Sequence, residues 1–175
     1  MLKDISNFDN LSDYHGIFNA ALLADIIIIF LLYYTKVFGA PETLKEWYEK
    51  YRLSAVIADV FILIIGMILG RIFYKKLFNK WNFIKFSLLI LVIQIIHDLL
   101  FYFLIIKPIS PDTNNMLSLF KRYADEVSYG AVLGDSFMMF ITVLFSSIFA
   151  NLSTNHNIIL SVILMYILPY ILYTK

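Results

Sequence analysis

Residues 83–106 read FIKFSLLILVIQIIHDLLFYFLII, an apolar run with one lysine near its start and one aspartate in its second half. A helix needs about 20 mostly apolar residues to cross the hydrocarbon core of a bilayer. The sequence therefore predicts an all-α, polytopic transmembrane helix bundle of about five spans in a single domain covering residues 1–175. The other expected spans are residues 17–38, 53–74, 129–151 and 158–173, of which the last is short and contains Pro169.

Composition supports a lipid environment. Of the 175 residues, 61% are hydrophobic and only 15% are charged, whereas soluble domains hold about 25% charged residues. A chain of this size cannot hide so much apolar surface in its own core. We therefore expect an integral, multi-pass membrane protein whose main partner is the lipid bilayer. The net charge of +1 supplies no basic field, so nucleic acid is not an expected partner.

Two absences narrow the chemistry further. The chain has no Cys, which excludes disulfides, thiolate metal sites and Cys nucleophiles. Its first sixteen residues contain Asp4, Asp9 and Asp13 against a single Lys3. That charge is the wrong sign for a cleaved signal peptide, so the first apolar run is expected to remain as an anchor.

Two of the links between spans are predicted to be amphipathic helices that lie at the membrane interface. Apolar residues recur at helical spacing in both, with charges on the opposite face. In residues 41–52 these are Leu44, Trp47, Tyr48 and Tyr51; in residues 113–127 they are Met116, Leu119, Phe120, Tyr123 and Val127.

The plan of the first two spans and their link is repeated by the third and fourth spans and theirs. This suggests a tandem helix-hairpin repeat of the parallel kind, with its axis along the membrane normal.

Four predicted spans carry an aspartate: Asp25, Asp59, Asp98 and Asp135. A carboxylate at the centre of a membrane helix costs about 2.5–3.5 kcal/mol on the insertion scale. We therefore expect these side chains to face one another or a wet cavity. Counting along each span places three of them roughly 10 Å below the membrane side opposite the N-terminus, and Asp25 deeper.

Other polar residues are expected to join this layer. His97 lies at the same level, although it points about 100° away from Asp98 on a helix. Gln94 is one turn before Asp98 and Tyr102 is one turn after it, so both share its face.

Such a cluster suits three kinds of chemistry. Like charges close together cannot all ionise, so at least one carboxyl should hold a proton near neutrality. A divalent cation could instead bind Asp59, Asp98 and Asp135, with His97 admitting a softer metal. The acids and His97 could also pass protons, or act as general acid and base on a lipid. The alternative is that each aspartate only hydrogen-bonds to a neighbouring helix and fixes packing.

Small residues mark expected close contacts between helices. Gly66 and Gly70 form a small-xxx-small pattern, for which packing inside the bundle is favoured over formation of a homo-oligomer. Gly130 and Gly134 are expected to let the fourth span bend or approach a partner next to Asp135.

Residues 94–102 (QIIHDLLFY) and 120–139 (FKRYADEVSYGAVLGDSFMM) resemble uncharacterised multi-spanning membrane proteins of large double-stranded DNA viruses, the giant viruses. The resemblance implies a virion inner membrane or a host cell membrane. It implies no established activity and assigns no functional residues.

Three functional hypotheses follow. The first is a small channel- or transporter-like protein that handles cations or protons through the Asp/His cluster. The second is a membrane-embedded enzyme that uses the same acids on a lipid substrate. The third is a structural membrane protein of a virion. Measurements of ion flux, lipid turnover and oligomerisation distinguish the three hypotheses.

Overall fold

The computed structural model describes residues 2–35, 40–110 and 113–174, and in these ranges all the regular structure is helical. Five helices are long and apolar enough to cross a membrane, which confirms the predicted all-α bundle. The last residues of the first expected span, 36–38, lie outside the described residues. The five helices are α1 (Asp13–Tyr34), α3 (Leu53–Leu77), α4 (Phe83–Phe101) with its π-helical extension η2 (Tyr102–Ile106), α6 (Gly130–Phe149) and α7 (Thr154–Leu172).

Two of these helices begin four residues before the expected spans. α1 begins at Asp13 and α7 begins at Thr154. The reason is that hydropathy counts only the apolar part of a span, whereas the helix also includes the polar turn that precedes it. Ser153 caps α7 by accepting a hydrogen bond from the backbone N–H of His156. Pro169 lies inside α7 without ending it.

The two amphipathic links form the short helices α2 (Glu42–Tyr51) and α5 (Asn115–Val127). Pro41 directly precedes the first turn of α2, where a missing N–H does no harm. Asn114 caps α5, since its side-chain oxygen accepts from the N–H groups of Met116 (2.9 Å) and Leu117 (3.2 Å).

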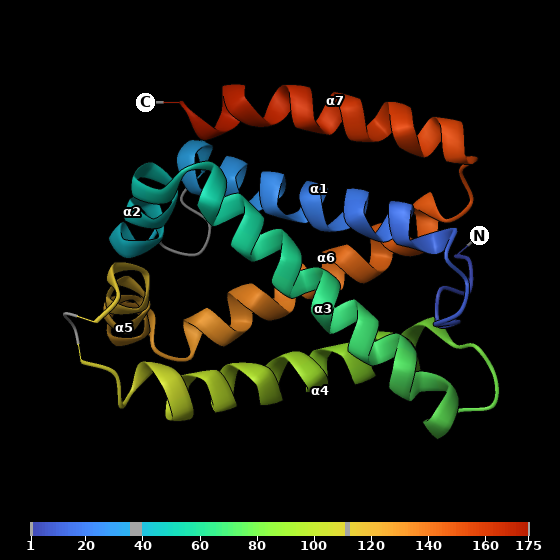
Figure 1. Cartoon of the computed structure of the whole chain (residues 1–175), viewed down its shortest axis with the longest axis horizontal. Coiled ribbons are helices and arrows are strands. Elements are labelled where there is room, and N and C mark those ends of the chain that lie inside the picture. The colour runs from blue at the N-terminus through green and yellow to red at the C-terminus, as the bar shows by residue number, and fades with distance from the viewer. Residues whose placement is uncertain (1, 36–39, 111–112, 175) are drawn as a thin grey trace.

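The long helices run between two ends of the bundle (Figure 1). The A end holds the N-terminal segment and the loops after α3 and α6; the B end holds α2, α5 and the C-terminal end of α7. α1 is the most buried of the five long helices and packs against α3, α6 and α7. α4 packs against α3 and α6.

The outer helices expose apolar side chains along much of their length. α4 and α7 are the least buried of the five. Large apolar side chains that water would not tolerate in such numbers are compatible with a lipid-facing surface. They include Ile84, Leu88, Val92, Ile96 and Leu100 on α4, and Ile159, Val162, Ile163 and Met165 on α7.

The order long helix, amphipathic helix, long helix occurs twice, in α1–α2–α3 (the first half) and in α4–α5–α6 (the second half). Both halves start at the A end (Figure 1). The residue that joins each amphipathic helix to the next long helix has the same positive-φ conformation: φ 50°, ψ −124° at Arg52 and φ 50°, ψ −123° at Ser128. Asp59 follows Arg52 by the same number of residues as Asp135 follows Ser128.

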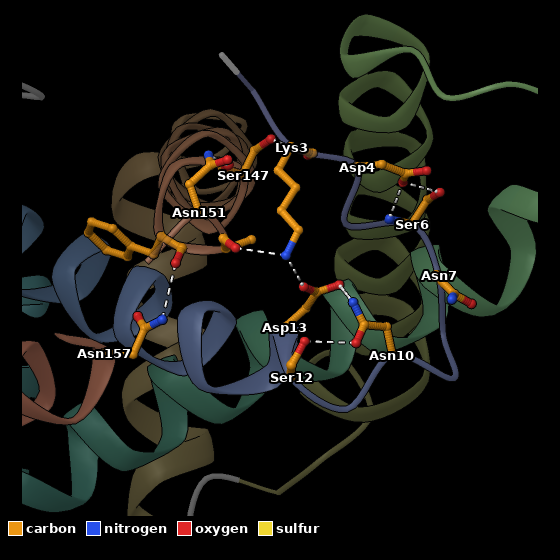
Figure 2. Close-up of polar contacts among 12 residues, drawn as sticks. Lys3, Asp4, Ser6, Asn7, Asn10, Ser12, Asp13, Ser147, Asn151 and Asn157 are labelled. Atoms are coloured by element: carbon orange, nitrogen blue, oxygen red, sulfur yellow. Dashed lines mark hydrogen bonds and ion pairs between the residues drawn. The ribbon is translucent and has the colours of Figure 1, made fainter. Parts of the chain in front are cut away.

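At the A end, buried charges are paired. Arg71 and Asp13 are fully buried and lie 3.6 Å apart, and the Asp13 carboxylate also accepts hydrogen bonds from Lys3 and Asn10. Lys3 donates as well to the carbonyl of Ala150, at 2.7 Å, so the N-terminal segment is tied to the end of α6 (Figure 2). Each charge here has an opposite charge beside it, as a buried ion requires.

The glycines of the long helices differ in how closely other helices approach them. At Gly66 a side chain would collide with Met139 of α6, and at Gly70 with Ile90 of α4, so both glycines permit close helix packing inside the bundle. At Gly134 no atom beyond the glycine's own chain neighbours and helix backbone lies within 4 Å of where its side chain would begin, so no partner helix approaches closely there. Gly130 has only Val127 nearby, at 3.6 Å.

Candidate functional site

A cavity of about 970 Å³ lies at the B end and is lined by residues of α1, α2, α3, α4 with η2, α5 and α6. Four carboxyl-bearing residues line it: Asp59, Asp98 and Asp135 come from three different long helices, and Asp125 comes from α5. Its lining contains most of the residues that the sequence assigned to the site, namely Asp59, Asp98, Asp135, His97, Gln94 and Tyr102.

Asp25 lies behind the cavity wall, joined to Asp59 through Tyr48 of α2. The Tyr48 hydroxyl lies 2.7 Å from Oδ1 of Asp25 and 3.0 Å from Oδ2 of Asp59. The same Oδ2 accepts a hydrogen bond from the Trp47 indole N–H at 2.9 Å. Asp25 was expected deeper than the other acids, but the phenol of an interfacial helix reaches it directly.

The hydrogen bonds among Tyr48, Asp25 and Asp59 need one more hydrogen than the phenol can supply. A phenol carries a single O–H hydrogen, and that hydrogen cannot serve two ionised carboxylates at once. Full hydrogen bonding among Tyr48, Asp25 and Asp59 requires one of the carboxyls to carry a proton and donate it to the phenol oxygen. Burial and the charges of the two aspartates raise the pKa of Tyr48 well above its usual range, so the phenol itself keeps its hydrogen.

Asp98 is partly satisfied by its own helix. Its Oδ1 accepts a hydrogen bond from Nε2 of Gln94 at 2.6 Å and lies 3.2 Å from Nδ1 of His97. Its Oδ2 is buried and has no hydrogen-bond partner. Gln94 therefore shares the face of Asp98, as the one-turn spacing predicts, while Tyr102 lines the cavity from η2.

Asp135 is the least satisfied of the acids. Among the described residues, no side chain or backbone group forms a hydrogen bond or ion pair with its carboxyl. Its strongest electrostatic neighbours are other acids, Asp98 and Asp59, which repel it. A carboxyl in this position needs a proton or a positively charged partner.

Tyr123 of α5 also lines the cavity. Burial, together with the negative charges of Asp135, Asp59, Glu126 and Asp98, raises the pKa of its phenol well above the usual range. The Tyr123 hydroxyl therefore keeps its hydrogen.

From their spacing in the sequence, Trp47, Tyr48 and Tyr123 were expected only on the apolar face of interfacial helices and not in the site. A signal was present, because a buried Trp or Tyr still needs a partner for its polar end. An aromatic residue with a polar tip, on a helix next to a span that carries an aspartate, satisfies that need.

Aromatic residues occupy matching positions in the two halves. Counting back from Arg52 and from Ser128, Trp47 of the first half corresponds to Tyr123 of the second. The next position differs: Tyr48 in the first half corresponds to Ala124 in the second. Ala124 lines the cavity and has no hydroxyl to reach a carboxyl. The first half thus closes its pair of acids with a phenol, although Oδ2 of Asp25 stays buried without a hydrogen-bond partner, and the second half has no such bridge.

Glu126 holds the two interfacial helices together over the cavity. Its carboxylate accepts hydrogen bonds from the N–H groups of Glu42 (2.9 Å) and Thr43 (3.0 Å), and from the Thr43 hydroxyl. Because these N–H groups belong to the first turn of α2, the carboxylate also meets the positive end of the helix dipole. Arg122 adds an ion pair with Glu46, at 2.7 Å.

Positive charge is missing from the cavity itself. None of its lining residues in the described ranges is Lys or Arg. In the same part of the chain, no three His, Asp or Glu side chains are grouped closely enough to hold a metal ion. The predicted divalent-cation site at Asp59, Asp98 and Asp135 therefore receives no support from the geometry.

No family model matches the chain, and no curated protein or solved structure shows significant similarity to it. These comparisons do not bear on the resemblance to giant-virus membrane proteins, which stays a prediction. The function has to be argued from the cavity.

Proposed function

We propose that this chain is an integral membrane protein that takes up protons or cations into the B-end cavity, in the manner of a small channel or transporter. One observation carries the proposal: three carboxyl groups from three long helices line one cavity, with no Lys or Arg among its described lining residues. Ionisable groups inside membrane helices are retained chiefly at ion paths, proton relays and ligand sites.

The repeated helix order supports this function. In transporters built from repeats, the binding site lies where the repeats meet. The cavity is lined by both halves, with Asp59 from the first and Asp98 and Asp135 from the second. Tyr48 and Asp59 both line this cavity, so the proton that they and Asp25 need for full hydrogen bonding would be taken up at the cavity wall.

The test is flux in liposomes containing the purified full-length protein. Proton and monovalent-cation movement is measured with internal fluorescent indicators, at matched protein incorporation. We expect carboxylate-dependent flux that falls at least about tenfold in Asp98→Asn and Asp135→Asn. Asp9→Asn is the matched control, because Asp9 is an exposed carboxylate at the A end. Flux that is absent, or equal in all four proteins, rejects the proposal.

A lipid-directed enzyme is the second candidate, favoured by the His97–Asp98 pair inside a cavity large enough for a ligand of lipid size. Asp98 would orient the imidazole, which would act as general base or acid. Incubation with mixed membrane lipids, followed by mass spectrometry, tests it. Product formation abolished by His97→Ala supports the enzyme; unchanged lipids reject it.

A further inference from the structure

The B-end cavity is much larger than an inorganic ion requires. Its volume of about 970 Å³ is at the upper end of the range of about 300–1,000 Å³ found for pockets that hold drug-sized molecules. A bound Mg²⁺ or Ca²⁺ needs about six or more oxygen atoms at about 2.0–2.6 Å. The described residues offer no such group of ligands.

Aromatic rings form much of the cavity wall. Phe120 of α5 lies between Trp47 of α2, with ring centroids 4.7 Å apart, and Phe101 of α4, with centroids 6.3 Å apart. Tyr102 continues this wall in η2, where the helix widens to a π-helix, a distortion that is frequent at functional sites. Aromatic faces attract organic cations as well as apolar groups.

The charges in the cavity specify the sign of the ligand. Asp135 has no partner in the described structure, and Oδ2 of Asp98 is buried without one. A phosphate group would be repelled by these acids, and no described Lys or Arg of the lining could hold it. A phospholipid headgroup is therefore a poor occupant, whereas a cation without phosphate is complementary.

We propose that the cavity binds an amphiphilic organic cation, with its charged centre between Asp98 and Asp135 and its apolar body against the aromatic wall of α2, α4 and α5. This inference rests on the proposed function and names the substrate class of the same site. The carboxyls attract the cation without coordinating it at metal distances, which suits groups spread around a large cavity.

Two ions of the same shape and opposite charge test the proposal directly. Tetraphenylphosphonium and tetraphenylborate are titrated into the full-length protein in nanodiscs and followed by calorimetry. We expect saturable binding of tetraphenylphosphonium and none of tetraphenylborate. Asp135→Asn and Asp98→Asn are expected to weaken binding about tenfold each, while Asp9→Asn leaves it unchanged. Equal binding of both ions, or binding unaffected by both cavity substitutions, overturns the proposal.

Tryptophan emission locates the bound ion. Of the two tryptophans, Trp47 lines the cavity and Trp81 lies in the loop after α3 at the A end. In a Trp81→Phe background we expect tetraphenylphosphonium to alter the emission of Trp47. In a Trp47→Phe background the emission of Trp81 should stay constant, and a change confined to Trp81 overturns the assignment of the site.

The flux assay on the same preparations separates this inference from the proposed function. Carboxylate-dependent proton or cation flux without tetraphenylphosphonium binding overturns the organic-cation inference alone. Binding that requires Asp98 and Asp135, without any flux, supports the ligand class and rejects the transport function.

Discussion

The first half of the bundle, α1–α2–α3, and the second half, α4–α5–α6, each carry two aspartates in their long helices. The contacts of the two pairs differ. In the first half, Tyr48 bridges Asp25 and Asp59. In the second half, the corresponding residue is Ala124, and Asp98 and Asp135 face a cavity. One side chain thus separates a closed pair of carboxyls, bridged by a phenol, from an open pair that lacks this bridge.

The largest expected effect comes from making the first half resemble the second. Tyr48→Ala removes a fully buried aromatic side chain and the hydroxyl that serves two carboxyls. We expect a loss of about 3–5 kcal/mol in the free energy of unfolding, as for other buried aromatic truncations. Denaturant unfolding in micelles, followed by circular dichroism, measures it. A loss below about 1 kcal/mol would contradict the idea that Tyr48 stabilises the first half by closing its pair of acids.

The hydroxyl alone is tested by Tyr48→Phe. Removing it leaves Asp25 Oδ1 without its donor, and we expect a loss of about 1–3 kcal/mol in unfolding free energy. Tyr51→Phe is the matched control on the same helix, because the Tyr51 hydroxyl is buried without a hydrogen-bond partner. Its removal should be neutral. Equal effects at both positions would show that Tyr48 acts through packing alone.

The reverse change makes the second half resemble the first. Ala124→Tyr places a ring in the cavity and offers a hydroxyl to the open pair of acids. We expect tetraphenylphosphonium binding and flux to fall about tenfold or more, equivalent to at least about 1.4 kcal/mol. Ala21→Ser, a small change in the buried face of α1, is a control for general perturbation. Full binding in Ala124→Tyr would contradict the comparison.

Neutralising one acid in each half should have opposite effects on stability. Asp59→Asn weakens acceptance from Trp47 and Tyr48, so we expect a loss of about 1 kcal/mol. Asp135→Asn removes a carboxyl that has no described partner, so stability should stay equal or rise by up to about 1 kcal/mol. Thermal unfolding of the two variants in the same detergent measures the contrast. Equal losses would mean that the second pair is also structural.

The smallest effect concerns the contact between the interfacial helices of the two halves. Burial opposes ionisation of Glu126, but hydrogen bonds from Thr43 and the α2 backbone, with the charge of Arg122, lower its pKa below the ordinary 4.5. A carboxyl with a lowered pKa stabilises the fold fully above its ordinary value and loses that contribution as pH falls through the lowered pKa. Thermal stability of the parent protein should therefore drop slightly below pH 4.5, and Glu126→Gln should remove that part of the drop. An identical pH profile in Glu126→Gln would contradict the role of this contact.

Much of the fold follows from the sequence, because hydropathy along the chain directly reports which segments lipid can surround. The five long helices and the two amphipathic links could be predicted, as could the gathering of Asp59, Asp98 and Asp135 on the side of the interfacial helices. The helix ends were less accurate, since polar turns such as the one at Thr154 extend helices beyond the apolar run.

The details of the site could not be predicted in the same way. Spacing along a helix gives the face of a residue and its depth, so it related Gln94 to Asp98. It does not say which side chain from another helix meets that face. The phenol of Tyr48 between two acids, the open space at Gly134 and the loss of a partner at Ala124 all depend on how α2 and α5 lie across the bundle.

The sequence by itself determined the class of the molecule, because apolar runs, charge placement and helical periodicity are local properties of the chain. It predicted that four acids in apolar helices would be sheltered from lipid. Only the tertiary structure decided which pair of acids a phenol closes and which pair has no such bridge, because that depends on contacts between helices far apart in the chain. A hydrogen bond forms only when donor and acceptor lie about 3 Å apart. Whether a pair of acids is bridged therefore depends on one side chain, tyrosine in the first half and alanine in the second.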